Sequence, residues 1–227
     1  MNHLLKITAL LGLITTSAVQ AADLPSTVEQ SHEILLGRQS SASPIPQKEL
    51  DEAKGVAIID ITKGGFVVGG IGGDGVVLVK IKSGLGGFLG ARNWSAPIPI
   101  GFSGGSFGAQ IGGSNTKAIV LLNSDRAVER FTKPGKVGWS ASATGTVGGD
   151  HRSEQEGGLL NDSDIKIFQS TEGLYGGAVF GGSSLSINNK AISRTYGSGK
   201  GVRDILEGGV SAPPYAKKLV EVLNGKR

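Results

Sequence analysis

Apolar residues alternate with polar or small ones over much of the chain between residues 55 and 187, which is the period of a β-strand. In residues 76–82 one set of alternate positions is valine, valine and isoleucine, and the other set ends in Lys80 and Lys82. The same period, or a short β-branched run bounded by turn residues, predicts the other strands. They cover residues 56–61, 66–68, 98–113, 118–122, 137–147, 165–169, 174–180 and 184–187.

Helical signals lie mainly near the two ends of the chain. At the first of them, Ser26 and Glu29 have the spacing of a capping box, and Gly37 is expected to end the helix. Helices are predicted at residues 25–36, 47–54, 124–131, 202–206 and 214–223. With many strands between them, the expected fold is α+β: a strongly twisted antiparallel sheet, closed or nearly closed as a β-barrel or sandwich, with N- and C-terminal helices.

Glycine is the composition's most unusual feature. The chain of 227 residues contains 38 glycines, and many of them stand in pairs between β-branched runs. Such pairs indicate tight turns, bulges or close backbone approach within a sheet. Asp74 and Gly75, between two apolar runs, have the sequence of a hairpin turn. Two similar glycine-rich stretches, at residues 62–70 and 171–177, suggest either a duplicated hairpin or the general likeness of such turns.

The first 21 residues have the pattern of a signal peptide. A short basic start is followed by an apolar stretch at residues 7–19, and small residues precede a cleavage site after Ala21. We therefore expect residues 1–21 to be removed and the mature protein to be exported, most simply to a bacterial periplasm. Residues 22–44 then form an N-terminal helix and linker, and residues 45–227 the main domain. The chain has no cysteine, so its stability must come from packing.

The net charge of +4 comes from basic residues that are spread along the chain among 19 acidic ones. A nucleic-acid-binding protein usually gathers its basic residues in a patch with aromatic residues between them, and aromatic residues are only 5% here. The sequence therefore predicts no nucleic-acid partner, and leaves weak attraction to anionic lipid headgroups open.

No stretch of the sequence predicts a catalytic or metal site. Residues 70–75 match the glycine spacing of a dinucleotide-binding loop, but a strand rather than a helix is expected to follow them, so a hairpin turn is the better interpretation. The histidines His32 and His151 are far apart in sequence and no cysteine accompanies them. We expect a protein that is not an enzyme and has no metal or cofactor.

The candidate surface residues surround the second half of the first β hairpin. Trp94, in a Trp-Ser-Ala-Pro corner, is expected either to pack in the core or to face a ligand or membrane, with Ser95 bonding the backbone. Nearby lysine and arginine side chains either form a solvated face or hold a phosphate-bearing headgroup. The candidate lipid-binding residues are Lys63, Lys80, Lys82, Arg92 and Trp94.

Seven segments in order resemble the SYLF domain family, and they extend from about residue 45 to 223. They read IPQKELDEAKGVAII (45–59), KGGFVVGGIGGDGVVLV (63–79), NWSAPIPIG (93–101), GGSFGAQIGG (104–113), AIVLLNSDRAVERF (118–131), TVGGDHR (146–152) and EGLYGGAVFGGSSL (172–185). This resemblance implies a non-enzymatic lipid-binding domain. It also implies phosphoinositides as ligands of eukaryotic members and actin as a partner of some fungal members.

The sequence departs from the eukaryotic members of this family at two places. Its first helix carries Glu29 and Glu33 and no lysine, and Ser170, Thr171 and Glu172 stand where the family has basic residues. An exported bacterial protein is also expected to meet neither actin nor phosphoinositides. The expected function is therefore binding of anionic phospholipid, or of a membrane surface, in the periplasm. The alternative is a structural or protein-interaction module of the envelope without a lipid ligand.

Overall fold

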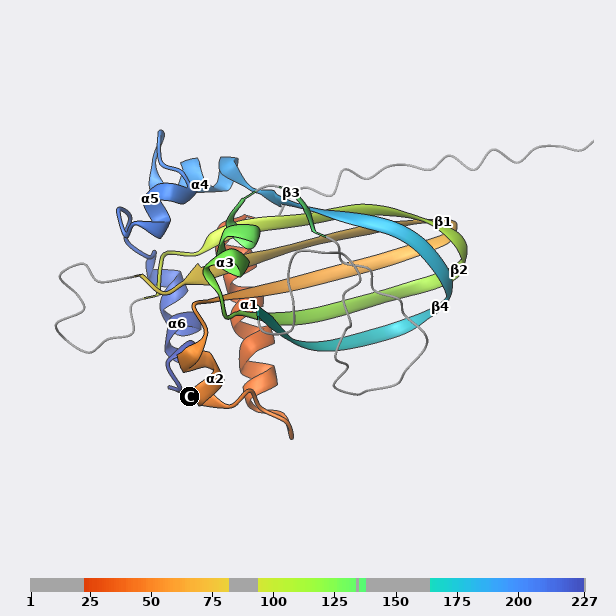
Figure 1. Cartoon of the computed structure of the whole chain (residues 1–227), viewed down its shortest axis with the longest axis horizontal. Coiled ribbons are helices and arrows are strands. Elements are labelled where there is room, and N and C mark those ends of the chain that lie inside the picture. Colours follow the sequence, from red (N-terminus) through yellow and green to blue (C-terminus); the bar gives the residue numbers. More distant parts are fainter. Residues whose placement is uncertain (1–22, 82–93, 134, 138–163, 227) are drawn as a thin grey trace, which may run out of the picture.

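The structure, a computed structural model, describes residues 23–81, 94–133, 135–137 and 164–226. Three very long strands build it: β1 (Gly55–Val79), β2 (Ile98–Leu122) and β4 (Ile165–Ile187). They pair antiparallel along almost their whole length, and the short β3 (Gly135–Val137) pairs with β4. The order β1-β2-β4-β3 is that of one antiparallel sheet (Figure 1).

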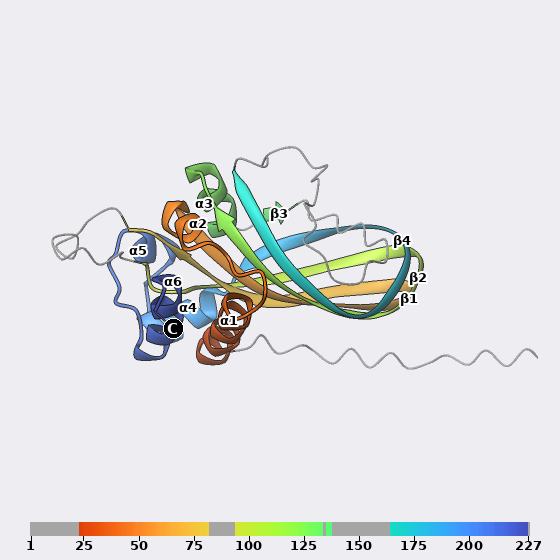
Figure 2. The same ribbon diagram turned by 90° about the horizontal axis from the view of Figure 1, so that it is seen from below.

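Each long strand runs away from the helices and then doubles back, as Figure 1 shows. In β1 the outward and return limbs lie side by side, because the amide of Lys80 donates to the carbonyl of Lys54 at 2.8 Å. Further along, Gly75 approaches the backbone of Ile58 and Ile59. The helices therefore gather at one end of the sheet, and the bend forms the other end (Figures 1 and 2).

The bend explains much of the glycine content. A Cβ on Gly75 would lie 3.0 Å from the Cα of Ile59 and would also meet the main-chain oxygen of Ile58. A Cβ on Gly73 would likewise meet the main-chain oxygen of Asp60 and would lie 3.0 Å from the Cα of Ile61. Since the two limbs of β1 meet backbone to backbone at these positions, no side chain fits between them.

The hairpin turn predicted at Asp74 and Gly75 is wrong, and so is the turn expected for residues 70–75. These residues lie inside the return limb of β1, where Gly75 pairs with Ile100 of β2. The chain reverses earlier, between Ile61 and Gly73, and the register between the strands shifts near Phe66. The local sequence resembles a turn because a close-packed limb and a turn both require glycine.

The strands predicted as separate pieces are continuous. Residues 98–113 and 118–122 belong to β2, and the three segments between 165 and 187 belong to β4. The strand predicted at 137–147 lies outside the described residues except at Val137. The two similar glycine-rich stretches occupy matching positions on either side of β2, where Thr62 pairs with Asn115 and Asn115 with Glu172.

The helices are α1 (Leu24–Gln39), α2 (Gln47–Glu52), α3 (Asp125–Thr132), α4 (Asn189–Tyr196), α5 (Val202–Leu206) and α6 (Lys217–Leu223), with a 3₁₀ turn η2 (Pro214–Ala216) before α6. All were predicted except α4. At α1 the predicted capping box is wrong: Asp23 caps the helix by accepting from the amide of Ser26. The helix also continues through Gly37 to Gln39.

Two hydrophobic cores cover the two faces of the sheet. Val56, Ile58 and Leu78 point to the face that packs against α1, α2 and α6. Ala57, Ile59 and their neighbours point to the other face, which α3, α4 and α5 cover. The expected α+β fold with a twisted antiparallel sheet and terminal helices is confirmed. The described strands form an open sheet, however, so the closed barrel is wrong.

Candidate functional site

Lys80 and Trp94 lie together where the return limb of β1 reaches the helices. The Lys80 ammonium group donates to the carbonyl oxygens of Leu50 at 2.9 Å and Asp51 at 2.6 Å, and it lies 5.1 Å from the centre of the Trp94 ring. These carbonyls belong to the last turn of α2, where a cation is favoured by the helix dipole. Lys80 therefore joins α2 to the sheet.

Trp94 packs in the core, which is one of the two roles expected for it. Its side chain is 7% exposed, and its indole N–H donates to Asn224 beyond α6 at 3.2 Å. The predicted backbone contact of Ser95 is confirmed, because its hydroxyl accepts from the amide of Val79 at 3.1 Å. The corner therefore links the end of β1 to the C-terminal helix.

Lys63 lies apart from this corner, in the bent part of β1, where it pairs with Ser114 of β2. Its side chain is half-buried, and burial lowers the pKa of its ammonium group. The structure therefore separates Lys63 from Lys80 and Trp94. Lys82 and Arg92 lie outside the described residues, so lipid contact by these five residues stays a prediction.

The lowered pKa of Lys63 predicts a pH dependence of stability. Over the range between its folded pKa and the ordinary value of 10.5, the unfolded chain binds this proton more tightly than the folded one. The free energy of unfolding should therefore gain a contribution that rises with pH up to that value. Urea unfolding at several alkaline pH values should show a smaller rise in Lys63→Met. Lys48→Met, at a lysine that is 83% exposed, is the control and should keep the full rise.

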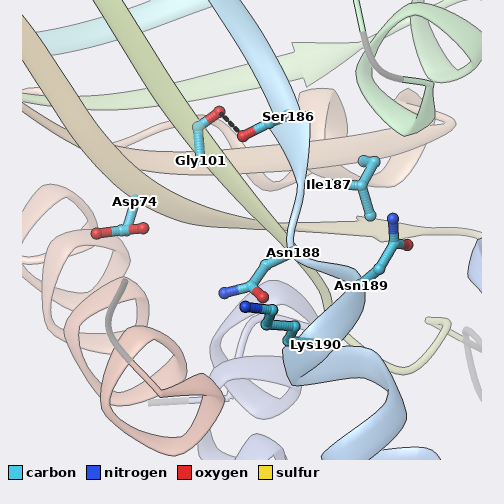
Figure 3. Close-up of a pocket in the computed structure, with 7 residues that line it drawn as sticks. All are labelled: Asp74, Gly101, Ser186, Ile187, Asn188, Asn189 and Lys190. Atoms are coloured by element: carbon cyan, nitrogen blue, oxygen red, sulfur yellow. Dashed lines mark hydrogen bonds between the residues drawn. The ribbon is translucent and has the colours of Figure 1, made fainter. Parts of the chain in front are cut away.

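A surface depression of about 350 Å³ lies at the junction of β1, β2, β4 and α4 (Figure 3). Its lining residues are Asp74, Gly101, Ser186, Ile187, Asn188, Asn189 and Lys190. The Ser186 hydroxyl donates to the Gly101 carbonyl at 3.2 Å, and the Asn188 side chain caps α4 by accepting from Ala191. Sequence patterns do not indicate this depression, because Asp74 is far from α4 along the chain and no helical period marks α4.

The depression is lined by polar and charged groups. A carboxylate at Asp74 and an ammonium at Lys190 lie at its rim without a histidine or cysteine among the lining residues. Separately placed charges of this kind could contact a small polar group. Elsewhere among the described residues, no group of three or more His, Cys, Asp or Glu side chains is placed to hold a metal ion.

None of the helices in the described part of the chain is both long enough and apolar enough to cross a membrane. His32 lies on α1 at a partly exposed position, and His151 lies outside the described residues.

Comparison with known proteins gives a consistent result. The family model of Ysc84, described as "Las17-binding protein actin regulator", matches residues 103–226. The rat SH3 domain-containing YSC84-like protein 1 is 33% identical over 181 residues, which cover 79% of this chain and 51% of the relative. The Protein YSC84 of Saccharomyces cerevisiae is 32% identical over 188 residues, covering 80% of this chain and 38% of the relative.

The chain thus spans about half the length of the vertebrate relatives that it matches, and less of the yeast ones. The description of the family, and the name of a further relative from Saccharomyces cerevisiae, LAS seventeen-binding protein 3, refer to binding of another protein. No solved structure matches. Because the family model covers more than half of the chain and relatives above 30% identity cover most of it, the chain belongs to the Ysc84 family, which is the SYLF domain family indicated by its ordered motifs.

Proposed function

We propose that this domain binds anionic phospholipid, or a membrane surface rich in it, in the bacterial periplasm and acts without catalysis. The observation that carries the proposal is the similarity to a relative from the same family over 79% of the chain, since the SYLF resemblance implies a lipid-binding domain. Residues 1–21 have the pattern that would deliver the domain to the envelope, where phospholipid surfaces are abundant.

The charge of the chain supports the same function. The net charge is +4, and a positive protein is attracted to an anionic membrane surface over roughly one Debye length. Many of the described surface cations are paired with carboxylates, such as Lys54 with Asp125 at 2.9 Å and Lys166 with Glu49 at 2.6 Å. The attraction is therefore expected to be moderate and reversible, as in a peripheral membrane protein.

Liposome co-sedimentation of the mature domain, residues 22–227, tests this proposal. We expect the domain to sediment with vesicles that contain phosphatidylglycerol and to remain in solution with pure phosphatidylcholine. Raising the salt from about 0.1 M to about 1 M should release it, because the Debye length falls from about 10 Å to about 3 Å. Equal sedimentation with both vesicle types would contradict the electrostatic part, and no sedimentation with either would reject the proposal.

A second candidate function is a protein-interaction module of the envelope. The printed names of the family and of the yeast relative LAS seventeen-binding protein 3 favour it, because both describe binding to another protein. No actin is expected in the proposed compartment. Capture of one envelope protein by the mature domain, together with no vesicle binding, would support this candidate against the first.

A further inference from the structure

The turn before α6 exposes an aromatic side chain at the helical end of the molecule. Tyr215 in η2 is 37% exposed, and it is the one large hydrophobic side chain that is exposed among the described residues. Ala212 and Pro214 beside it are exposed too, and so are the two lysines that open α6. These five residues, Ala212, Pro214, Tyr215, Lys217 and Lys218, are called the Tyr215 surface.

The Tyr215 ring is held by two neighbouring elements. Partial burial raises the pKa of its phenol, a hydrogen bond from Thr195 of α4 opposes this shift, and the charge of Asp23 adds to it. The phenol is therefore neutral at neutral pH, with an apolar ring and a polar tip. A side chain of this kind is enriched at the boundary between membrane and water.

The lysines of the Tyr215 surface are exposed to solvent. Lys218 is exposed and follows Tyr215 by three residues, which places both on one side of this short helical segment. Lys217 pairs with Glu221 at 3.9 Å, and its side chain is 77% exposed, so the pair is weak. Long lysine side chains beside an interfacial aromatic residue can extend to phosphate groups.

The start of the described chain lies at the same place. Asp23 caps α1 and lies close enough to Tyr215 for its charge to act on the phenol, and α1 contacts both η2 and α6. Figures 1 and 2 show α1, α4 and α6 together at this end of the molecule.

We propose that the Tyr215 surface is where the domain meets the bilayer, with Tyr215, Ala212 and Pro214 in the headgroup region and Lys217 and Lys218 on lipid phosphates. This inference rests on the proposed function and names the surface that performs it. The outer side of α1 is less suited, because the exposed Glu29 and Glu33 would face anionic headgroups.

A fluorescent label tests the location directly, because the chain has no cysteine of its own. Ala212→Cys in the mature domain keeps Tyr215 and carries a polarity-sensitive dye; Lys48→Cys on α2 carries the same dye as a control. With phosphatidylglycerol vesicles we expect the emission of the dye at position 212 to shift to shorter wavelength. The dye at position 48 should not respond.

Charge reversal gives a second measurement. Lys218→Glu should weaken binding to the same vesicles roughly thirtyfold, because the reversal changes the charge by two units and each unit near an anionic surface contributes about 1 kcal/mol. Lys48→Glu makes the same charge change at an exposed lysine of α2, outside the Tyr215 surface, and should bind almost as the unmodified domain does. Tyr215→Ser should also weaken binding while the urea unfolding midpoint changes little.

The outcomes separate this inference from the function on which it rests. If the unmodified domain sediments with vesicles but the dye at position 212 does not respond and Lys218→Glu binds like Lys48→Glu, the inference is overturned and the proposed function stands. If the unmodified domain does not sediment at all, both fall. The emission of the dye at position 212 could also shift without vesicles as the protein concentration is raised. This result would show that the surface contacts a second copy of the chain, and it would overturn the inference.

Discussion

Gly75→Ala is expected to destabilise the domain by about 3 kcal/mol or to prevent its folding, as overpacking of a rigid site does. The added methyl group would overlap the main-chain oxygen of Ile58, and it would lie 3.0 Å from the Cα of Ile59. Both atoms belong to the backbone of the outward limb of β1, so no side-chain rotation relieves the contact. Urea unfolding followed by circular dichroism measures the loss.

Gly72→Ala is the matched control for this change. Gly72 lies three residues earlier in the same return limb, and a Cβ there meets no atom within 4 Å. The free energy of unfolding of Gly72→Ala should differ from that of the unmodified domain by less than about 1 kcal/mol in either direction. If Gly75→Ala were as stable as Gly72→Ala, the two limbs of β1 would not lie backbone to backbone, and the doubled-back strand would be wrong.

Trp94→Ala is the second large effect that we expect, with a loss of about 3–5 kcal/mol, as for other buried tryptophans. The indole is 7% exposed, lies against the Lys80 ammonium group and donates to Asn224. Its removal leaves a cavity between the sheet, α2 and α6. The lower urea midpoint should be accompanied by faster proteolysis near the C-terminus, because one of the contacts of α6 is lost.

Trp94→Phe separates packing from lipid contact at this position. The phenyl ring keeps most of the apolar contact and loses the hydrogen bond to Asn224, so a loss of about 1 kcal/mol is expected. Vesicle binding by Trp94→Phe should equal that of the unmodified domain, since the buried indole offers little surface to a membrane. Weaker vesicle binding at unchanged stability would instead support the lipid-facing role considered for Trp94.

The candidate surface residues show where sequence reasoning reached its limit. The sequence groups Lys80 and Lys82 with Trp94 because they flank the same predicted hairpin, and the structure does bring Lys80 against Trp94. The strand pattern does not show that the Lys80 ammonium group is hydrogen-bonded to the carbonyl oxygens of Leu50 and Asp51 in α2. The exposure of Tyr215 is not visible in the local sequence, because it depends on how η2 packs beside α1 and α4.

The family could be predicted from the sequence alone, because seven segments in order resemble it, and the comparisons with known proteins agree. The helices at 47–52 and 125–132 were also predictable, since proline, serine and glycine mark helix ends locally. The helix α4 was missed because its single turn of apolar residues, Ala191 and Ile192, is too short for a helical period to appear.

The sequence by itself determined that the chain forms glycine-rich antiparallel strands between terminal helices, because strand period and capping signals act over a few residues. The tertiary structure decided how these strands are used. Whether Gly73 and Gly75 form a turn or line a limb depends on Asp60 and Ile58, which become neighbours only when β1 doubles back. Likewise, Lys80 becomes a helix cap and Tyr215 an exposed side chain through contacts between segments that are distant along the chain. Local pattern fixes the elements, and packing between distant segments decides which residues remain at the surface.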